Sequence, residues 1–98
     1  MKREWFLYII ETENGSFYTG ITTDLERRFS EHSGKSSGSG AKFFNRSAPK
    51  KIRYQLAGLD HSMALKIEHG IKKLKRQEKM KMIECGYDIH ELKLLLRL

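Results

Sequence analysis

The feature that most constrains the fold is a pair of strand-like segments joined by a tight turn. Residues 4–12 and 17–22 are rich in aromatic and β-branched residues, which favour strands. Between them stands Glu13-Asn14-Gly15-Ser16, and Asn and Gly tolerate the positive φ angles of tight hairpin turns. The pattern predicts an antiparallel β-hairpin.

A short helix is expected directly after the hairpin. Thr23 followed by Glu26 has the spacing of a capping box, so the helix should begin at about Asp24. Arg28 and His32 are four residues apart and therefore share one face of that helix. A guanidinium and an imidazole are thus presented together, close in sequence to the tyrosines of the hairpin.

A third strand and a longer helix are expected in the second half of the chain. Residues 51–57 alternate apolar and polar side chains, which predicts a strand, and Gly58 and Asp60 should end it. Ser62 is expected to cap a helix that runs to about residue 75. The apolar stripe that should face the sheet is Ala64, Ile67, Ile71 and Leu74.

Two more helical segments follow. One covers residues 77–85 and ends at Gly86, because glycine accommodates the left-handed conformation that follows many helices. Asp88 and Glu91 have the spacing to cap a last helix, which is rich in leucine. We expect this apolar tail to pack on the body of the protein or on a second copy, as in a homodimer.

Between the first helix and the third strand, residues 33–48 show neither helical nor strand periodicity, which predicts a long loop. Loops of that length in compact domains more often bind something or stay mobile than do nothing. Phe43 and Phe44 lie among the basic residues of this loop, which are Lys35, Lys42 and Arg46. The loop either follows a nucleic-acid backbone and stacks a base on a phenylalanine, or is anchored to the core by the two phenylalanines.

The charge of the chain favours a polyanionic partner. Its 98 residues suit a single domain, and 19 Lys and Arg residues against 12 Asp and Glu give a formal charge of +7. DNA is the first candidate, and RNA is not excluded. An acidic membrane surface is less favoured, because the basic residues are spread over several elements and do not gather on one amphipathic helix.

Composition also bears on the compartment. No apolar stretch is long enough to span a bilayer, and no signal peptide is visible, so we expect no membrane partner. Cys85 is the only cysteine, which excludes an intrachain disulfide and a cysteine metal cage. A single cysteine fits a reducing, cytoplasmic location.

In combination, these residues resemble the GIY-YIG nuclease domain family, in particular its small stand-alone bacterial members similar to the UPF0213 group. The matching positions are Phe6-Leu7-Tyr8 in the first strand, Tyr18-Thr19-Gly20 in the second, Arg28 and His32 in the first helix and Glu68 in a later helix. The resemblance covers residues 4 to about 80. We therefore divide the chain into a nuclease-like domain of residues 1–80 and a C-terminal helical extension of residues 81–98.

The resemblance implies a small α/β (α+β) domain with a three-stranded, mainly antiparallel sheet flanked by helices. It also implies metal-dependent cleavage of DNA phosphodiester bonds, in a family whose members act in repair, recombination and restriction. Tyr18 would take a proton from the attacking water while Tyr8 orients it, or the two roles would be exchanged. Arg28 would hold the scissile phosphate, and His32 would support a tyrosine or protonate the leaving group. Glu68 would coordinate Mg²⁺ or Mn²⁺.

Two departures from the family pattern bear on whether the chain is a nuclease or a non-catalytic binding module. Some members carry a lysine directly after the second-strand glycine, where this chain has Ile21, and an asparagine of some members has no match near Met80. A non-catalytic nucleic-acid-binding module is therefore the second hypothesis, and a protein-interaction domain using the leucine-rich tail is the third. Lys72, four residues after Glu68, either pairs with that carboxylate or contacts nucleic acid together with the basic residues of the loop.

Overall fold

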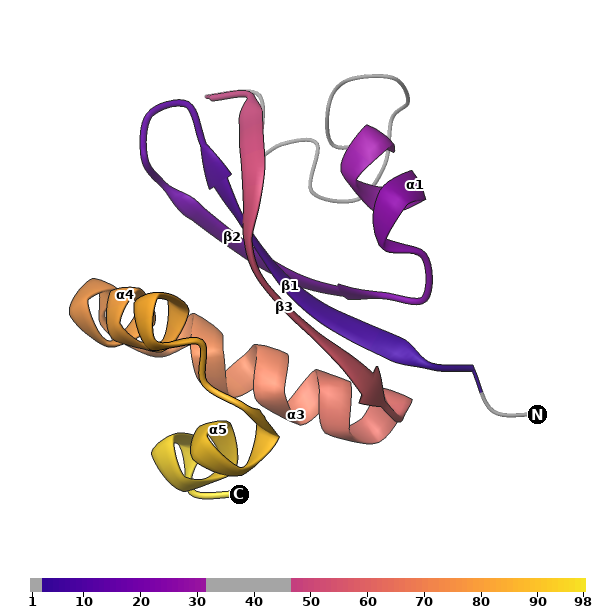
Figure 1. The fold of residues 1–98 in the computed structure, drawn as a ribbon, viewed down its shortest axis with the longest axis vertical. Coiled ribbons are helices and arrows are strands. Elements are labelled where there is room, and N and C mark those ends of the chain that lie inside the picture. Colours follow the sequence, from indigo (N-terminus) through magenta and orange to yellow (C-terminus); the bar gives the residue numbers. More distant parts are fainter. Residues whose placement is uncertain (1–2, 32–46) are drawn as a thin grey trace.

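The fold was analysed in a computed structural model of the chain, which describes residues 3–31 and 47–98. Three strands and four helices lie in these two ranges (Figure 1). They are β1 (Trp5–Thr12), β2 (Phe17–Thr22), α1 (Leu25–Ser30), β3 (Pro49–Leu59), α3 (His61–Lys72), α4 (Arg76–Cys85) and α5 (Ile89–Leu96). None of the described helices is long and apolar enough to cross a membrane.

The strands form one antiparallel sheet in the order β2-β1-β3, so the first strand lies in the middle. The hairpin between β1 and β2 is where the sequence predicts it, and Gly15 adopts a φ of 85° in its turn, a conformation that glycine enters without steric cost. The sheet and its flanking helices confirm the expected fold class.

The two faces of β1 are covered by different helices. Leu7 and Ile9 are fully buried in the same core cluster as Ile67 and Ile71 of α3. Because side chains alternate along a strand, Tyr8 points to the opposite face, where α1 lies. Figure 1 shows α1 on one side of the sheet and α3, α4 and α5 on the other.

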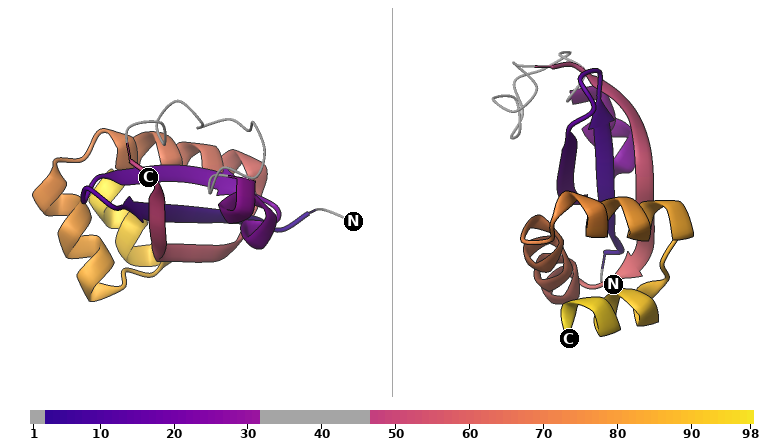
Figure 2. Two further views of the ribbon diagram at one scale, coloured as in Figure 1. Left: turned by 90° about the horizontal axis from the view of Figure 1, so that it is seen from above. Right: turned by 90° about the vertical axis from the view of Figure 1, so that its left-hand side faces the viewer.

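The C-terminal helix packs on α3, next to which it lies in both views of Figure 2. Leu92 of α5 is fully buried, and Leu96 packs against the core. The approach is close at Gly70, where a Cβ atom would lie 3.0 Å from Leu96 Cδ2. The apolar tail therefore contacts the body of its own chain, and the division at residue 80 stays a prediction.

The third strand is longer than the sequence pattern indicates. It runs through Gly58, which was expected to end it, and reaches Leu59. Gly58 has a φ of 77°, and the pairing with β1 is irregular there, because Trp5 faces Leu59 while Leu7 faces Leu56. The glycine therefore accommodates a bulge within the strand.

Two predicted helix caps are wrong, and in both cases an aspartate takes the place of a hydroxyl residue. Asp24, not Thr23, caps α1, and Asp60, not Ser62, caps α3 by accepting a 2.7 Å hydrogen bond from the backbone N–H of Met63. α3 also ends at Lys72, earlier than predicted.

The capping and C-terminal signals of the last two helices are confirmed. Asp88 and Glu91 form the capping box of α5, and Gly86 ends α4 in the left-handed conformation with a φ of 61°. Most of the predicted loop of residues 33–48 lies outside the described residues.

Candidate active site

Two tyrosines project from the same face of the β-hairpin. Tyr8 of β1 is paired with Gly20 of β2, and Tyr18 of β2 is paired with Ile10 of β1. The two side chains are therefore diagonal neighbours on one face. Their ring centroids lie 6.3 Å apart and the rings are tilted by 42°. The two phenols that the sequence places on separate strands thus meet on one surface.

The ring of Tyr8 lies across the backbone of β2 at Gly20. A Cβ atom at Gly20 would lie 2.6 Å from Tyr8 Cζ, a separation that real atoms do not tolerate. Gly20 has no positive φ, so the glycine is needed for space and not for backbone conformation. Its absent side chain is what lets the phenol cover the edge strand, where Tyr8 is almost fully buried.

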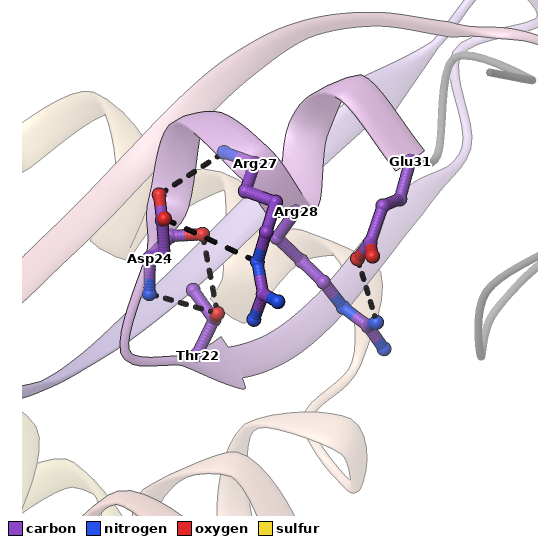
Figure 3. A network of polar contacts seen from close by, with 5 residues as sticks. All are labelled: Thr22, Asp24, Arg27, Arg28 and Glu31. Carbon is purple, nitrogen blue, oxygen red and sulfur yellow. Dashed lines mark hydrogen bonds and ion pairs between the residues drawn. The ribbon is translucent and has the colours of Figure 1, made fainter. Parts of the chain in front are cut away.

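The start of α1 fixes the direction in which its side chains point (Figure 3). The backbone N–H of Asp24 donates to Thr22 Oγ1 at 3.1 Å, and the Asp24 carboxylate accepts from the backbone N–H of Arg27 at 3.1 Å. The end of β2 and the first turn of the helix are thereby held together. Because the helix begins so soon after β2, Arg28 is brought back over the tyrosine face of the hairpin.

Hydrogen bonds hold the Arg28 side chain in place. Its Nη1 donates to Glu31 Oε1 at 3.2 Å, and the guanidinium also donates to the Tyr8 hydroxyl. The side chains of Arg28 and Glu31 are only 20% and 26% exposed. Burial opposes the charge of Arg28, but the hydrogen bonds to Tyr8 and Glu31 outweigh it and raise the pKa of the guanidinium. Arg28 is thus a permanently charged group fixed beside a phenol.

Tyr8 is a neutral phenol at physiological pH. Burial raises its pKa from 10 to about 12, with smaller contributions in the same direction from the charges of Tyr18 and Glu68. The hydrogen bond from Arg28 and the charge of the guanidinium lower the pKa but do not offset burial. The Tyr8 hydroxyl is therefore suited to donating a hydrogen bond and poorly suited to accepting a proton.

Glu68 is contributed by α3 and is near enough for its charge to act on the Tyr8 hydroxyl. Its carboxylate Oε2 lies 3.6 Å from Lys72 Nζ, the pairing that the spacing of the two residues suggests. The Glu68 side chain is 19% exposed and that of Lys72 is 53% exposed. A partly buried carboxylate with an exposed partner thus lies near the Tyr8 hydroxyl.

The donor chemistry fits a hard divalent cation held by one protein carboxylate. Among residues 3–31 and 47–98, no three His, Cys, Asp or Glu side chains are grouped as a metal cage. Mg²⁺ commonly takes one or two carboxylates and completes its shell with water and phosphate oxygens. The charge of the Glu68 carboxylate reaches the Tyr8 hydroxyl, so Glu68 is the residue that would hold such an ion.

Several predicted site residues are not located by the structure. His32, Lys35, Lys42 and Arg46 lie outside the described residues. Ile21, which stands where some relatives have lysine, packs against the hydrophobic core on the face of β2 opposite to Tyr18.

The sequence analysis missed Glu31. The i, i+3 spacing of Arg28 and Glu31 on a helix is the signal that would have suggested the ion pair. The spacing alone does not distinguish an ion pair in solvent from an ion pair packed against a buried phenol. The difference depends on how α1 packs over the hairpin, which the spacing does not indicate.

Comparison with known proteins gives the family. A family model described as the GIY-YIG catalytic domain matches residues 4–82. The UPF0213 protein YhbQ of Escherichia coli strain HS is 38% identical over 88 residues, which cover 90% of this chain and 85% of the relative. The protein of the same name from Shigella boydii matches equally well.

A solved structure has the same fold. The solution NMR structure of a UPF0213 protein from Bacillus halodurans is similar with a TM-score of 0.55 and 26% sequence identity. The similarity covers 92% of this chain and 93% of the other chain.

Proposed function

The chain belongs to the GIY-YIG catalytic domain family, and on that premise we propose that it is a metal-dependent endonuclease that hydrolyses DNA phosphodiester bonds. The observation that carries the proposal is the contact between Arg28 and Tyr8, beside Tyr18 and within the electrostatic reach of Glu68. Phosphodiester hydrolysis requires a phosphate-binding cation, a proton acceptor for water and shielding of the developing charge. This cluster contains a candidate for each requirement.

In this proposal Arg28 binds the scissile phosphate. A guanidinium presents planar donors that match two phosphate oxygens, which a lysine does not. Glu31 and the Tyr8 hydroxyl limit the rotamers of Arg28, so little conformational entropy is lost when phosphate arrives.

We assign proton removal from the attacking water to Tyr18 and positioning of that water to Tyr8. Tyr8 is almost fully buried and its pKa is raised to about 12, which makes it a weak candidate for the base. Tyr18 is more exposed and lies on the same face. His32 is proposed to support a tyrosine or to protonate the leaving oxygen.

Glu68 is proposed to hold Mg²⁺ or Mn²⁺. When bound, the cation supplies charge that shields the phosphoryl oxygens as negative charge builds on them. Lys72 pairs with Glu68 in the structure, and we propose that it also contacts the nucleic-acid backbone, as do Lys35, Lys42 and Arg46.

The substrate is expected to be recognised through its backbone or its structure. A charge of +7 on a small domain attracts phosphates without regard to sequence, which favours contacts with the backbone over readout of bases. A role in DNA repair or recombination, a cytoplasmic location and homodimer formation through the C-terminal helix stay predictions from the sequence.

The test is cleavage of labelled duplex, single-stranded and branched DNA in Mg²⁺ or Mn²⁺. Wild type should cut, and Arg28→Ala and Glu68→Ala, purified identically, should bind DNA without cutting it. A chelator should stop the wild-type reaction. Equal trace activity in all three proteins would point to a contaminant, and the non-catalytic nucleic-acid-binding module would then replace the nuclease.

A further inference from the structure

An apolar groove lies between α3 and α5, on a part of the molecule that the proposed chemistry does not use. Its volume is about 620 Å³. Five leucines line it: Leu65, Leu74, Leu95, Leu96 and Leu98. Figure 2 shows the two helices and the C-terminus beside each other. We call this feature the α3–α5 groove.

The groove exists because α5 covers only part of α3. Gly70 allows α5 to approach closely at Leu96. Beyond this contact Leu65 remains 44% exposed and Leu98 remains 50% exposed. Grouped exposed leucines in a concave site are unfavourable in water and are typical of a surface that a partner covers.

The rim of the α3–α5 groove is basic. Lys66 and His69 lie on α3, Lys73 directly follows that helix, and Arg97 directly follows α5. All four are exposed. In the described ranges of the chain, no Asp or Glu lines the groove. An apolar floor with a cationic rim is complementary to leucine-like side chains flanked by carboxylates.

We propose that the α3–α5 groove docks an acidic amphipathic helix of a partner protein. Its apolar side chains, at i, i+3 or i+4 and i+7 spacing, enter the leucine floor, and its Asp and Glu residues pair with Lys66, Lys73 and Arg97. Docking places the partner on α3, the helix that also carries Glu68. The partner would thereby be held next to the candidate active site without covering the tyrosine face of the hairpin.

Three other occupants fit the groove less well. A second copy would bring the same basic rim against itself in a two-fold interface, so like charges would face each other. The charged backbone of a nucleic acid is not complementary to a leucine-lined floor. No Phe, Tyr or Trp of the described residues lines the groove to stack a base. A membrane surface is reached by protruding apolar residues, whereas these leucines line a concave site.

The probe is a fluorescent helical peptide of leucine and glutamate with one apolar stripe, and the matched control peptide carries lysine in place of glutamate. Fluorescence anisotropy and ¹H–¹⁵N shift mapping are recorded with the full chain. The acidic peptide should bind saturably, weaken as salt is raised, and shift the amides of Leu65, Gly70 and Leu98. The lysine peptide should bind at least about tenfold more weakly, the factor that corresponds to losing one or two favourable charge pairs.

The variant Lys66→Glu/Lys73→Glu should reverse the preference between the two peptides. Lys51→Glu/Lys81→Glu makes the same charge change at exposed positions that do not line the groove, and should keep the wild-type preference. Leu65→Gln should weaken both peptides without unfolding the chain, because Leu65 is already half-exposed.

Absence of saturable binding, shifts confined to other surfaces, or equal binding of both peptides would overturn the proposal. A concentration-dependent dimer that Leu65→Gln abolishes would assign the groove to a second copy instead. Displacement of the acidic peptide by DNA or by anionic vesicles, with shifts at the same amides, would assign it to those partners and equally overturn the proposal.

Discussion

Replacing Gly20 by alanine should destabilise the protein, and the cause should be the ring of Tyr8. The new Cβ would lie 2.6 Å from Tyr8 Cζ, and Tyr8 is almost fully buried, so the ring has little room to move away. Overpacking of this kind costs about 1–3 kcal/mol. In a domain of this size each kcal/mol lowers Tm by about 4–8 °C.

The effect of Gly20→Ala on the free energy of unfolding should change sign when the ring of Tyr8 is removed. The backbone of Gly20 does not require a positive φ. In a Tyr8→Leu background, whose side chain ends short of Cζ, Gly20→Ala should therefore stabilise the fold by about 0.4–1 kcal/mol, through the reduced entropy of the unfolded chain. The difference between the two backgrounds is then about 1.4–4 kcal/mol, obtained by adding these two contributions.

The assay is a double-mutant cycle measured by urea denaturation with circular dichroism, on wild type, both single variants and the double variant. Unchanged m-values and native spectra are the control for a common folded state. An equal loss of stability from Gly20→Ala in both backgrounds would refute the argument, because the cost would then be unrelated to the ring of Tyr8.

Three further predictions concern ionisation, charge and backbone conformation. Burial raises the pKa of Tyr8 and Tyr54 from 10 to about 12, so their neutral forms favour the folded state. This stabilisation is complete below about pH 10 and is lost as the pH rises through about 12. Ultraviolet titration should show two phenols that ionise late, and one of them should be missing in Tyr8→Phe or in Tyr54→Phe. Glu31→Gln should lower the free energy of unfolding by less than about 1 kcal/mol, because the pair with Arg28 is partly solvated. It should nevertheless tighten DNA binding in gel-shift assays, because it removes a negative charge beside the guanidinium. Weaker DNA binding would contradict this prediction. Gly86→Ala should lower the free energy of unfolding by about 1–2 kcal/mol in urea denaturation, because a φ of 61° is strained for alanine. The new Cβ would contact nothing within 4 Å, so the backbone is the cause of the loss. An unchanged free energy of unfolding would show that the helix end relaxes.

The local elements of the fold were largely predictable because their signals lie within a few residues. Asn14-Gly15 locates the hairpin, and Asp88 with Glu91 locates the last helix. The errors in the helix caps arose where two local signals compete. Both Asp60 and Ser62 are able to cap a helix, and only the geometry of the chain leaving β3 selects Asp60.

The sequence predicts which residues form the candidate site and their order along the chain, but not the contacts between their side chains. The residues of the family pattern, Tyr8, Tyr18, Arg28 and Glu68, are recognisable from the sequence. The burial of Tyr8, which sets its pKa, depends on the ring crossing β2 at Gly20. Such cross-strand and helix-to-sheet contacts depend on register and docking angle, which no local pattern encodes.

The proposed role of the Glu68 carboxylate is to serve phosphodiester cleavage, and not only to pair with Lys72 at the surface. It is tested most directly by comparing Glu68→Gln with Lys72→Gln, since each substitution breaks the same 3.6 Å ion pair. Single-turnover DNA cleavage would be followed with protein in excess and Mg²⁺ or Mn²⁺ titrated, so that weakened DNA binding does not limit the rate. Glu68→Gln should lose cleavage at every metal concentration, while Lys72→Gln should keep a rate within a few-fold of wild type. Equal rates in the two variants would contradict it, because the ion pair alone would then account for Glu68.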